Sequence, residues 1–334
     1  MLRCSIPAPR LLVGLLMLGV LPAAHGDWFS DAQDKMGTRV EIELWHDDAA
    51  EARRLIAAGM AEFDRIESAM STYRADSEIT RINEQAAAGP VVVGDELFAL
   101  IARALALSAT TEGAFDITYD SVGQLYDYRL NRRPDEPEIN AHLLTIDHRF
   151  VELDVAASTI RFAREGVRIN LGGIAKGYAC EAVIALLKER GVTHALATAG
   201  GDTRLLGDRG NGPWIVGIRD PDDKAGLITR LALANEAVST SGDYERFFIE
   251  DGVRYHHILD PSTGKSAGEL RSVTIVGPDA TMTDGLSTSV FVLGAQAGLE
   301  LIERLPDYEA IIIDASRRVQ FSTGLAAQQA RRAD

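Results

Sequence analysis

The second half of the chain alternates short apolar stretches with turn signals, and this pattern constrains the fold more than any other feature. The pairs Glu165-Gly166 and Asp251-Gly252 are typical of tight turns between adjacent antiparallel strands. Such hairpin signals outnumber strand–helix–strand units. We therefore predict an α+β fold of mixed or antiparallel sheets with packed helices, rather than a doubly wound parallel sheet.

Apolar periodicity places the individual elements. A strand is expected at 38–45, where Val40, Ile42 and Leu44 share one face. Further strands are expected at 159–163, 166–170, 193–198, 214–219, 228–234, 236–240 and 271–276, with hairpins over 245–258 and 310–322. Helices are expected at 48–70, 95–112, 174–190, 280–293 and 297–305. Residues 131–149, which contain two prolines, are predicted to be a connection.

The N-terminal residues have the pattern of a secretory signal peptide. Arg3 and Arg10 lie close to an apolar run over 11–21, and Ala24-His25-Gly26 places small residues at the −3 and −1 positions of a cleavage site. The run is shorter than the roughly 20 residues that span a bilayer, although an N-terminal membrane anchor is the alternative interpretation. We expect a cleaved signal over 1–26 and a single domain over 27–334.

Charge and cysteine content narrow the function further. The chain has a formal net charge of −15, which disfavours binding to nucleic acid. A small anionic ligand would need a local cation, backbone amides or a metal. Cys4 falls in the expected signal, so Cys180 has no partner for an intrachain disulfide. Because Cys180 lies in a helical pattern, we predict a buried apolar role for it rather than a nucleophilic one.

The segment from Asp284 to Leu293 carries an acid in an otherwise apolar helix. Asp284 and Thr288 are four residues apart, so their oxygens share one helix face. A buried carboxylate is costly unless it is paired or bound to a metal. Carboxylate and hydroxyl oxygens suit a hard cation such as Mg²⁺ or Ca²⁺. The alternative is a carboxylate satisfied by an arginine or by backbone N–H groups.

Glycine-rich loops follow several of the predicted strands. The run from Asn170 to Gly177 combines a strand end, a glycine pair and a helix start, where free N–H groups and Lys176 favour an anion. It is neither a Walker loop nor a GxGxxG motif, so a plain helix start with a solvated lysine is the alternative. Gly200-Gly201-Asp202 and residues 240–244 also place amide-rich backbone at strand ends, where each could be a simple tight turn.

Two further segments carry candidate polar groups. One of His256 and His257 must face inward if their strand is regular, and that histidine could be a general base, a phosphate donor or a structural residue. No HExxH motif or other His and Cys cluster favours zinc. Asp116, between Phe115 and Ile117, could accept a hydrogen bond from a ligand or cap a turn.

Taken together and in this order, these segments resemble the ApbE family of FAD:protein FMN transferases. The resemblance spans about 36 to 294, and its motifs are specific as an ordered set although each is weak alone. The matching motifs are Met36-Gly37-Thr38, Met70-Ser71-Thr72-Tyr73 with Asp76-Ser77-Glu78, residues 113–118, 171–178, Gly200-Gly201-Asp202, 240–244, 257–264 and 284–288.

The resemblance implies an exported, magnesium-dependent enzyme that uses FAD as a substrate. Such an enzyme moves the FMN moiety onto a threonine hydroxyl of a target flavoprotein, forms a phosphodiester bond and releases AMP. The implied partners are flavoprotein subunits of membrane electron-transfer complexes, which would bring the protein near the membrane surface. The implied location is the periplasm, at or near the inner membrane.

The resemblance also implies roles for individual residues. The divalent cation would be held by Asp284 and Thr288, with Ser287 and the Gly173 backbone contributing. His257 is the implied catalytic base. The implied FAD contacts are Met36, Tyr73, Ala114, Phe115, Asp116, Asn170, Lys176 and Ile258. Many relatives have aspartate where this chain has Asn170, which keeps a hydrogen-bonding oxygen but removes a charge.

Two other functions would use the same residues. A metal-dependent FAD pyrophosphatase would have water as the nucleophile and would release FMN and AMP. A non-catalytic periplasmic flavin-binding protein would leave FAD intact. Product analysis separates all three.

Overall fold

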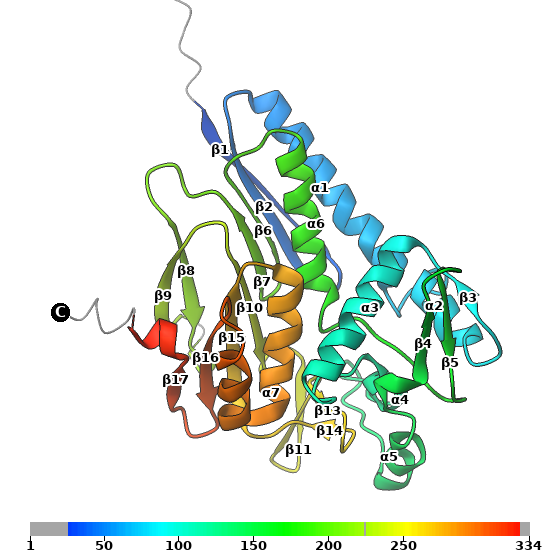
Figure 1. Ribbon diagram of the computed structural model, residues 1–334. Coiled ribbons are helices and arrows are strands. Elements are labelled where there is room, and N and C mark those ends of the chain that lie inside the picture. The colour runs from blue at the N-terminus through cyan, green and yellow to red at the C-terminus, as the bar shows by residue number, and fades with distance from the viewer. Residues whose placement is uncertain (1–25, 224, 328–334) are drawn as a thin grey trace, which may run out of the picture.

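The computed structural model describes residues 26–223 and 225–327 (Figure 1). Nearly all of the expected signal peptide, residues 1–25, therefore lies outside the described residues. The described part combines antiparallel sheets with helices packed on them, which confirms the predicted α+β class.

The central element is an eight-stranded sheet in which every neighbouring pair of strands is antiparallel. Its spatial order is β1-β2-β6-β7-β10-β15-β16-β17. The strands are β1 (Asp27–Lys35), β2 (Thr38–His46), β6 (Ala195–Ala199), β7 (Asp202–Leu206), β10 (Ala237–Gly242), β15 (Leu270–Gly277), β16 (Glu309–Asp314) and β17 (Val319–Phe321).

Smaller antiparallel sheets surround it. The three-stranded sheet consists of β3 (Val91–Val92), β5 (Thr159–Phe162) and β4 (Val151–Asp154). The two-stranded sheets are β8 (Trp214–Arg219) with β9 (Leu227–Leu233), β11 (Phe247–Glu250) with β12 (Val253–His256), and β13 (Leu259–Asp260) with β14 (Lys265–Ser266).

Three long helices pack on one face of the large sheet (Figure 1): α1 (Ala49–Met70) on β1 and β2, α6 (Ala175–Glu189) on β6 and β7, and α7 (Ala280–Glu303) on β10 and β15. The other helices are α2 (Glu78–Gln85), α3 (Asp95–Thr110), α4 (Asp120–Gly123) and α5 (Glu136–Leu143), with short 3₁₀ turns at Ile117–Tyr119 and His148–Phe150. The buried apolar residues of α1, α6 and α7 form one core with the sheet.

Helix α7 is long and apolar enough to pass as a membrane span by composition. More than half of that apolar stretch is buried in the protein, as expected for the core helix of a globular fold. The opposite face of the sheet is covered by the β8–β9 hairpin, whose Trp214, Ile218 and Leu231 pack on Val238 and Ile311.

Two of the expected elements differ from the structure for identifiable reasons. Residues 166–170 form no strand, because side chains take the place of a ladder: Arg168 N donates to Ser121 Oγ (3.0 Å) and Ile169 N to Asn83 Oδ1 (2.8 Å). The expected connection over 131–149 contains α5. Its Pro137 lies in the first turn, where a missing N–H costs nothing, and Asp135 and Glu138 form a capping box.

The other expected helices and hairpins are present, and one strand was not expected. The helices expected at 280–293 and 297–305 are both present within α7, where Gly294 with φ +80° breaks the helical backbone between them, as expected. Strand β1 was not expected, because its apolar residues do not alternate and none of its residues is buried. The hairpins expected over 245–258 and 310–322 are present as β11–β12 and β16–β17.

Candidate active site

Several of the predicted loops meet at one end of the large sheet because of strand register. Val40 near the start of β2 pairs with Ala199 at the end of β6, so the β1–β2 and β6–β7 turns lie side by side. Gly200 N donates to Arg39 O (3.0 Å), and Thr240 N donates to Gly201 O (3.1 Å). The N-terminal parts of α6 and α7 lie at this same end of the sheet, because Gly177 of α6 contacts Asp284 of α7 and Ser287 of α7 contacts Ser241 of β10.

Asp284 is buried at the contact between α6 and α7, with 2% of its surface exposed. Its Oδ2 accepts a hydrogen bond from Gly177 N (2.9 Å), and its Oδ1 lies 3.7 Å from Lys176 Nζ. The close approach requires glycine at 177, because a Cβ there would lie 2.0 Å from Ala280 O. The acid therefore faces the glycine-rich loop, as the sequence predicts, and its cationic neighbour is a lysine.

Lys176 links two buried carboxylates. Its Nζ donates to Asp202 Oδ2 at 2.7 Å, and Asp202 begins β7 directly after the Gly200-Gly201 turn. Burial alone would lower the pKa of Lys176, but Asp202 and Asp284 together hold that pKa above its ordinary value. Burial, and then the Asp202 charge, raise the pKa of Asp284 to about 7. The site thus holds more negative charge than one ammonium group balances.

Hydroxyl groups surround the carboxylate on α7. Ser241 Oγ, near the end of β10, lies 2.8 Å from Ser287 Oγ and 3.3 Å from Thr288 Oγ1. Ser287 Oγ also donates to the Asp284 carbonyl oxygen (2.8 Å). Gly173 abuts Thr288, since a Cβ at 173 would lie 3.3 Å from Thr288 Oγ1. The four residues predicted to hold a cation are therefore brought together.

The donor set decides which cation could fit. Among the described residues, no group of three or more His, Cys, Asp or Glu side chains is arranged to hold a metal ion. The predicted set has one carboxylate, two hydroxyls and a backbone carbonyl, which are hard oxygen donors of the kind that Mg²⁺ and Ca²⁺ accept. Burial and the Asp202 charge raise the pKa of Asp284 despite the Lys176 charge and the Gly177 N–H, so an added divalent cation would favour the charged form, and these oxygen donors fit it.

The adjacent histidines have different environments. His256 is buried, its Nε2 donates to Ala267 O (2.6 Å), and its Nδ1 accepts from Ile258 N (3.3 Å). His257 Nδ1 is buried without a hydrogen-bond partner among the described residues. Burial, followed by the charge of Arg246, lowers the pKa of His257 to about 3. Burial and the Arg246 charge therefore favour the neutral form of the His257 ring, which is the form that can accept a proton.

Asn170 belongs to a network that the sequence did not indicate. Its Nδ2 donates to Asp120 Oδ1 (3.0 Å) and its Oδ1 accepts from Gly172 N (2.8 Å). Arg168 Nε donates to the other oxygen of Asp120 at 2.6 Å. Burial raises the pKa of Asp120. A carboxylate therefore adjoins position 170 although the residue there is an amide.

The other predicted FAD contacts differ in how exposed they are. Asp116 is buried, accepts from Thr118 Oγ1 (2.6 Å) and from His148 N (2.7 Å), and so holds the 116–118 turn. Phe115 is buried next to Gly173, and Ala114 is half-buried. Ile258 is buried beside the histidine pair.

Met36 and Tyr73 lie in turns. Met36, in the β1–β2 turn, has φ +53° and donates its N–H to Glu67 Oε2 (2.9 Å). Tyr73 is 84% exposed in the turn after α1, and its neighbour Thr72 accepts from Asn170 Nδ2 at 3.3 Å. Tyr73 is therefore free to meet a ligand from the solvent side.

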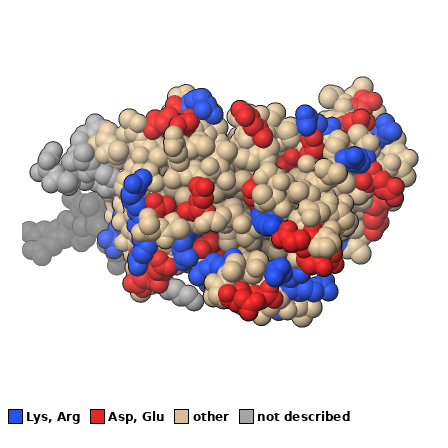
Figure 2. Space-filling model, turned by 90° about the horizontal axis from the view of Figure 1, so that it is seen from below, with Lys and Arg blue, Asp and Glu red and all other residues tan. Residues whose placement is uncertain are grey.

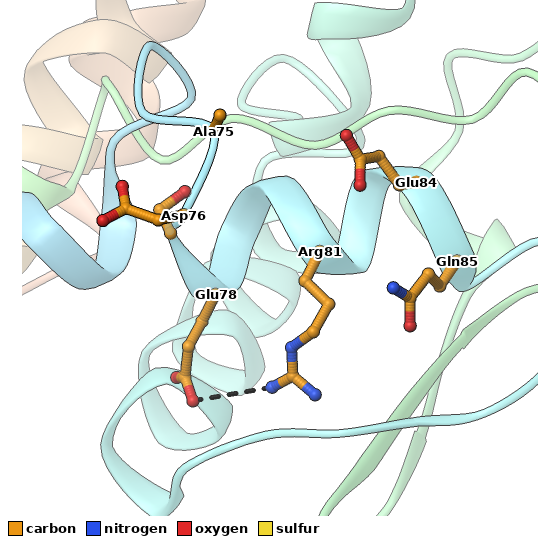
Figure 3. A pocket seen from close by; sticks show the side chains of 7 residues that line it. Ala75, Asp76, Glu78, Arg81, Glu84 and Gln85 are labelled. Atoms are coloured by element: carbon orange, nitrogen blue, oxygen red, sulfur yellow. Dashed lines mark ion pairs between the residues drawn. The ribbon is translucent and has the colours of Figure 1, made fainter.

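Surface hollows lie elsewhere. One of about 280 Å³ is lined by α2 and the turn before it, where the Glu78–Arg81 ion pair and the carboxylates of Asp76 and Glu84 gather (Figure 3). Its acidic lining would repel a pyrophosphate. A second hollow, of about 380 Å³, adjoins β16 and the Gly294 region. Neither is lined by a predicted site residue.

The chain is similar to proteins of known function over most of its length. The family model described as "ApbE family" matches residues 36–312. The FAD:protein FMN transferase of Treponema pallidum is 33% identical over 318 residues, covering 89% of this chain and 87% of that protein. The FAD:protein FMN transferase of Klebsiella pneumoniae is 32% identical, covering 86% and 90%.

Solved structures agree with the sequence relatives. The crystal structure of the ApbE protein from Thermotoga maritima superposes with a TM-score of 0.84 at 33% identity, covering 90% of this chain and 99% of that one. The apo form of the Pseudomonas stutzeri flavinyl transferase ApbE gives a TM-score of 0.79 at 28% identity, covering 90% and 96%.

Proposed function

The chain belongs to the ApbE family, and from this premise we propose that it is a magnesium-dependent enzyme that transfers the FMN moiety of FAD to a threonine hydroxyl of an acceptor flavoprotein. The observation that carries the proposal is the buried Asp284, which faces Lys176, the Gly177 amide and a set of hydroxyl groups at the end of the sheet. Such a site concentrates charged groups where a pyrophosphate must be held.

The residues divide the chemistry between them. Asp284, Ser287, Thr288 and the Gly173 carbonyl would hold the divalent cation, which when bound supplies charge neutralisation for the phosphoryl oxygens. Lys176, at the start of α6, adds a second positive charge. His257, in its neutral form, takes the proton of the threonine hydroxyl. The threonine oxygen forms a bond to the FMN phosphorus while the bond to the AMP phosphate breaks, and AMP leaves.

The pattern of the N-terminal residues supports a periplasmic location. We propose that residues 1–26 direct export and are cleaved, so that the domain acts in the periplasm. Its acceptors in this proposal are flavoprotein subunits of membrane electron-transfer complexes, whose periplasmic segments the enzyme meets at the inner-membrane surface.

The test is product analysis. The purified protein is incubated with FAD, Mg²⁺ and an acceptor domain that contains the candidate threonine. Mass spectrometry of the acceptor is expected to show FMN attached to that threonine, and chromatography an equal amount of AMP. Free FMN and AMP with an unmodified acceptor would instead establish a pyrophosphatase, and uncleaved FAD would establish a binding protein.

A further inference from the structure

Arg246 and His257 face each other one residue beyond the open end of the β11–β12 hairpin. The ladder pairs Phe247 with His256, and the next pair outward is joined by the His257 N–H donating to Arg246 O at 3.1 Å. Residues directly opposite in an antiparallel pair point to the same face. The Arg246 side chain therefore leaves the hairpin on the face that carries His257.

The guanidinium of Arg246 reaches the end of the large sheet. Its Nη2 donates to Gly37 O, in the β1–β2 turn, at 3.2 Å. Its charge contributes to lowering the pKa of His257, and it also acts on Lys176 and Tyr119. Arg246 thus lies at the end of the large sheet, between the Met36-Gly37 turn and His257.

The ion pairs of the region leave Arg246 without a counter-charge. Lys176 already pairs with Asp202 and Asp284. Arg254, on the other face of the hairpin, lies 3.6 Å from Asp243 and stacks over the Phe247 ring. Within the part of the chain that the structure describes, no carboxylate lies within 4 Å of Arg246, so its charge is available to an external anion.

An arginine without a nearby carboxylate is unusual in a chain this rich in acidic residues. The chain carries 49 acidic residues against 34 lysines and arginines. The end of the molecule at which β11 lies carries both signs of charge intermixed, not a uniform acidic cover (Figure 2). An unpaired guanidinium near the site would favour the approach of an anionic substrate to such an acidic protein.

We propose that Arg246 binds a phosphate oxygen of the FAD pyrophosphate and thereby positions the reacting phosphorus beside His257. The inference rests on the proposed function, because it takes FAD as the substrate of this site. A guanidinium presents several N–H donors in a fixed plane and can hold phosphate oxygens in one orientation, which a lysine does less well. Arg246 is in this view a substrate-positioning residue that acts beside His257, in addition to Lys176.

The test compares Arg246→Gln and Arg246→Lys with Arg254→Gln, which removes the same charge from the opposite face of the same hairpin. Binding of FAD and of riboflavin, which lacks phosphate, is measured by fluorescence titration in the presence of a metal chelator. Because a charged hydrogen bond contributes about 1.5–3 kcal/mol, Arg246→Gln is expected to weaken FAD binding about 10- to 100-fold. Riboflavin binding should not change, Arg246→Lys should fall between, and Arg254→Gln should resemble the parent protein.

Two results would overturn the proposal. Unchanged FAD affinity in Arg246→Gln would show that no phosphate contact exists. Equal weakening of FAD and riboflavin would show a contact with the flavin ring or a distorted site, which the melting temperature of each variant would help to distinguish. Failure of the proposed function is separate, because it would appear as a parent protein that does not bind FAD, or that binds it and transfers nothing.

Discussion

At the scale of single residues, the cost of burying Asp284 is the feature from which function can be argued. A buried carboxylate whose pKa is raised to about 7 destabilises the folded chain. An acid at such a position therefore points to a role that needs the charge. Lys176 offsets only part of this cost, because it also serves Asp202. The charge of Asp284 therefore favours metal binding but lowers the stability of the folded chain.

We expect Asp284→Asn to abolish metal-dependent transfer while leaving the metal-free protein no less stable. The amide removes the buried charge but keeps the volume, so activity should fall at least about 100-fold. The melting temperature without metal should stay equal or rise, because Lys176 keeps its closer ion pair with Asp202 and the buried excess charge is removed. Asp314→Asn, on β16 and away from the site, is the control. Full chelator-resistant activity in Asp284→Asn would contradict the assignment.

His257→Ala should slow the chemical step and spare FAD binding. Loss of a general base commonly costs about 10²- to 10⁴-fold, and His257 has no hydrogen bond through Nδ1 whose loss would disturb the fold. Single-turnover rates and FAD titrations measure the two effects separately. His142→Ala, near the end of α5, is the matched control. An unchanged single-turnover rate would remove His257 from the role of base.

The histidine pair also predicts the pH dependence of stability. Burial lowers the pKa of His256 to about 4 and that of His257 to about 3, from 6.5 in the unfolded chain. The unfolded state therefore binds more protons between these values, so stability falls as pH drops below 6.5. The slope is about 1.4 kcal/mol per pH unit for each histidine. Urea unfolding of parent and His256→Asn from pH 7 to 5 should show a shallower dependence in the variant.

At the scale of elements, the contact between α6 and α7 depends on a residue without a side chain. We expect Gly177→Ala to destabilise the protein by about 3 kcal/mol or more and to impair FAD and metal binding together, because the new Cβ would collide with the Ala280 carbonyl. Gly89→Ala is the control, since a Cβ there would have no neighbour within 4 Å. Thermal melts of both variants measure the difference. Equal melting temperatures would show that the helices move apart without cost.

Elements defined by local signals are those that the sequence predicts. The β11–β12 hairpin follows from Asp251-Gly252 and apolar alternation, and α1 follows from the stripe that includes Phe63 and Ile66. The extended run 166–170 misleads because its N–H groups bond to Ser121 and Asn83, which lie far away in sequence. Helix α5 is missed because Pro137 is a helix-starting residue here and a breaker elsewhere.

The site residues likewise divide into those that local motifs indicate and those that only the fold brings together. Asp284 and Lys176 were singled out from motifs, although the sequence could not show that Lys176 bridges Asp284 to Asp202 or that Ser241 meets Ser287. Asp120 was missed because it lies in no motif, and only the fold brings it to Asn170. Arg246 was missed for a similar reason: its importance depends on strand register and on the lack of a nearby acid, which are three-dimensional properties.

At the scale of the whole molecule, the proposal includes export, which we expect the N-terminal residues to direct. We expect the protein recovered from the periplasm of a Gram-negative host to begin at Asp27, as measured by intact mass. Replacing the small residue at −3 with Ala24→Phe should leave residues 1–26 attached and retain the protein at the membrane, because signal cleavage requires small side chains there. Ala8→Phe, outside the cleavage motif, is the control. A parent protein that keeps its first residues would establish an anchor instead, which would still hold the catalytic domain next to membrane-bound acceptors.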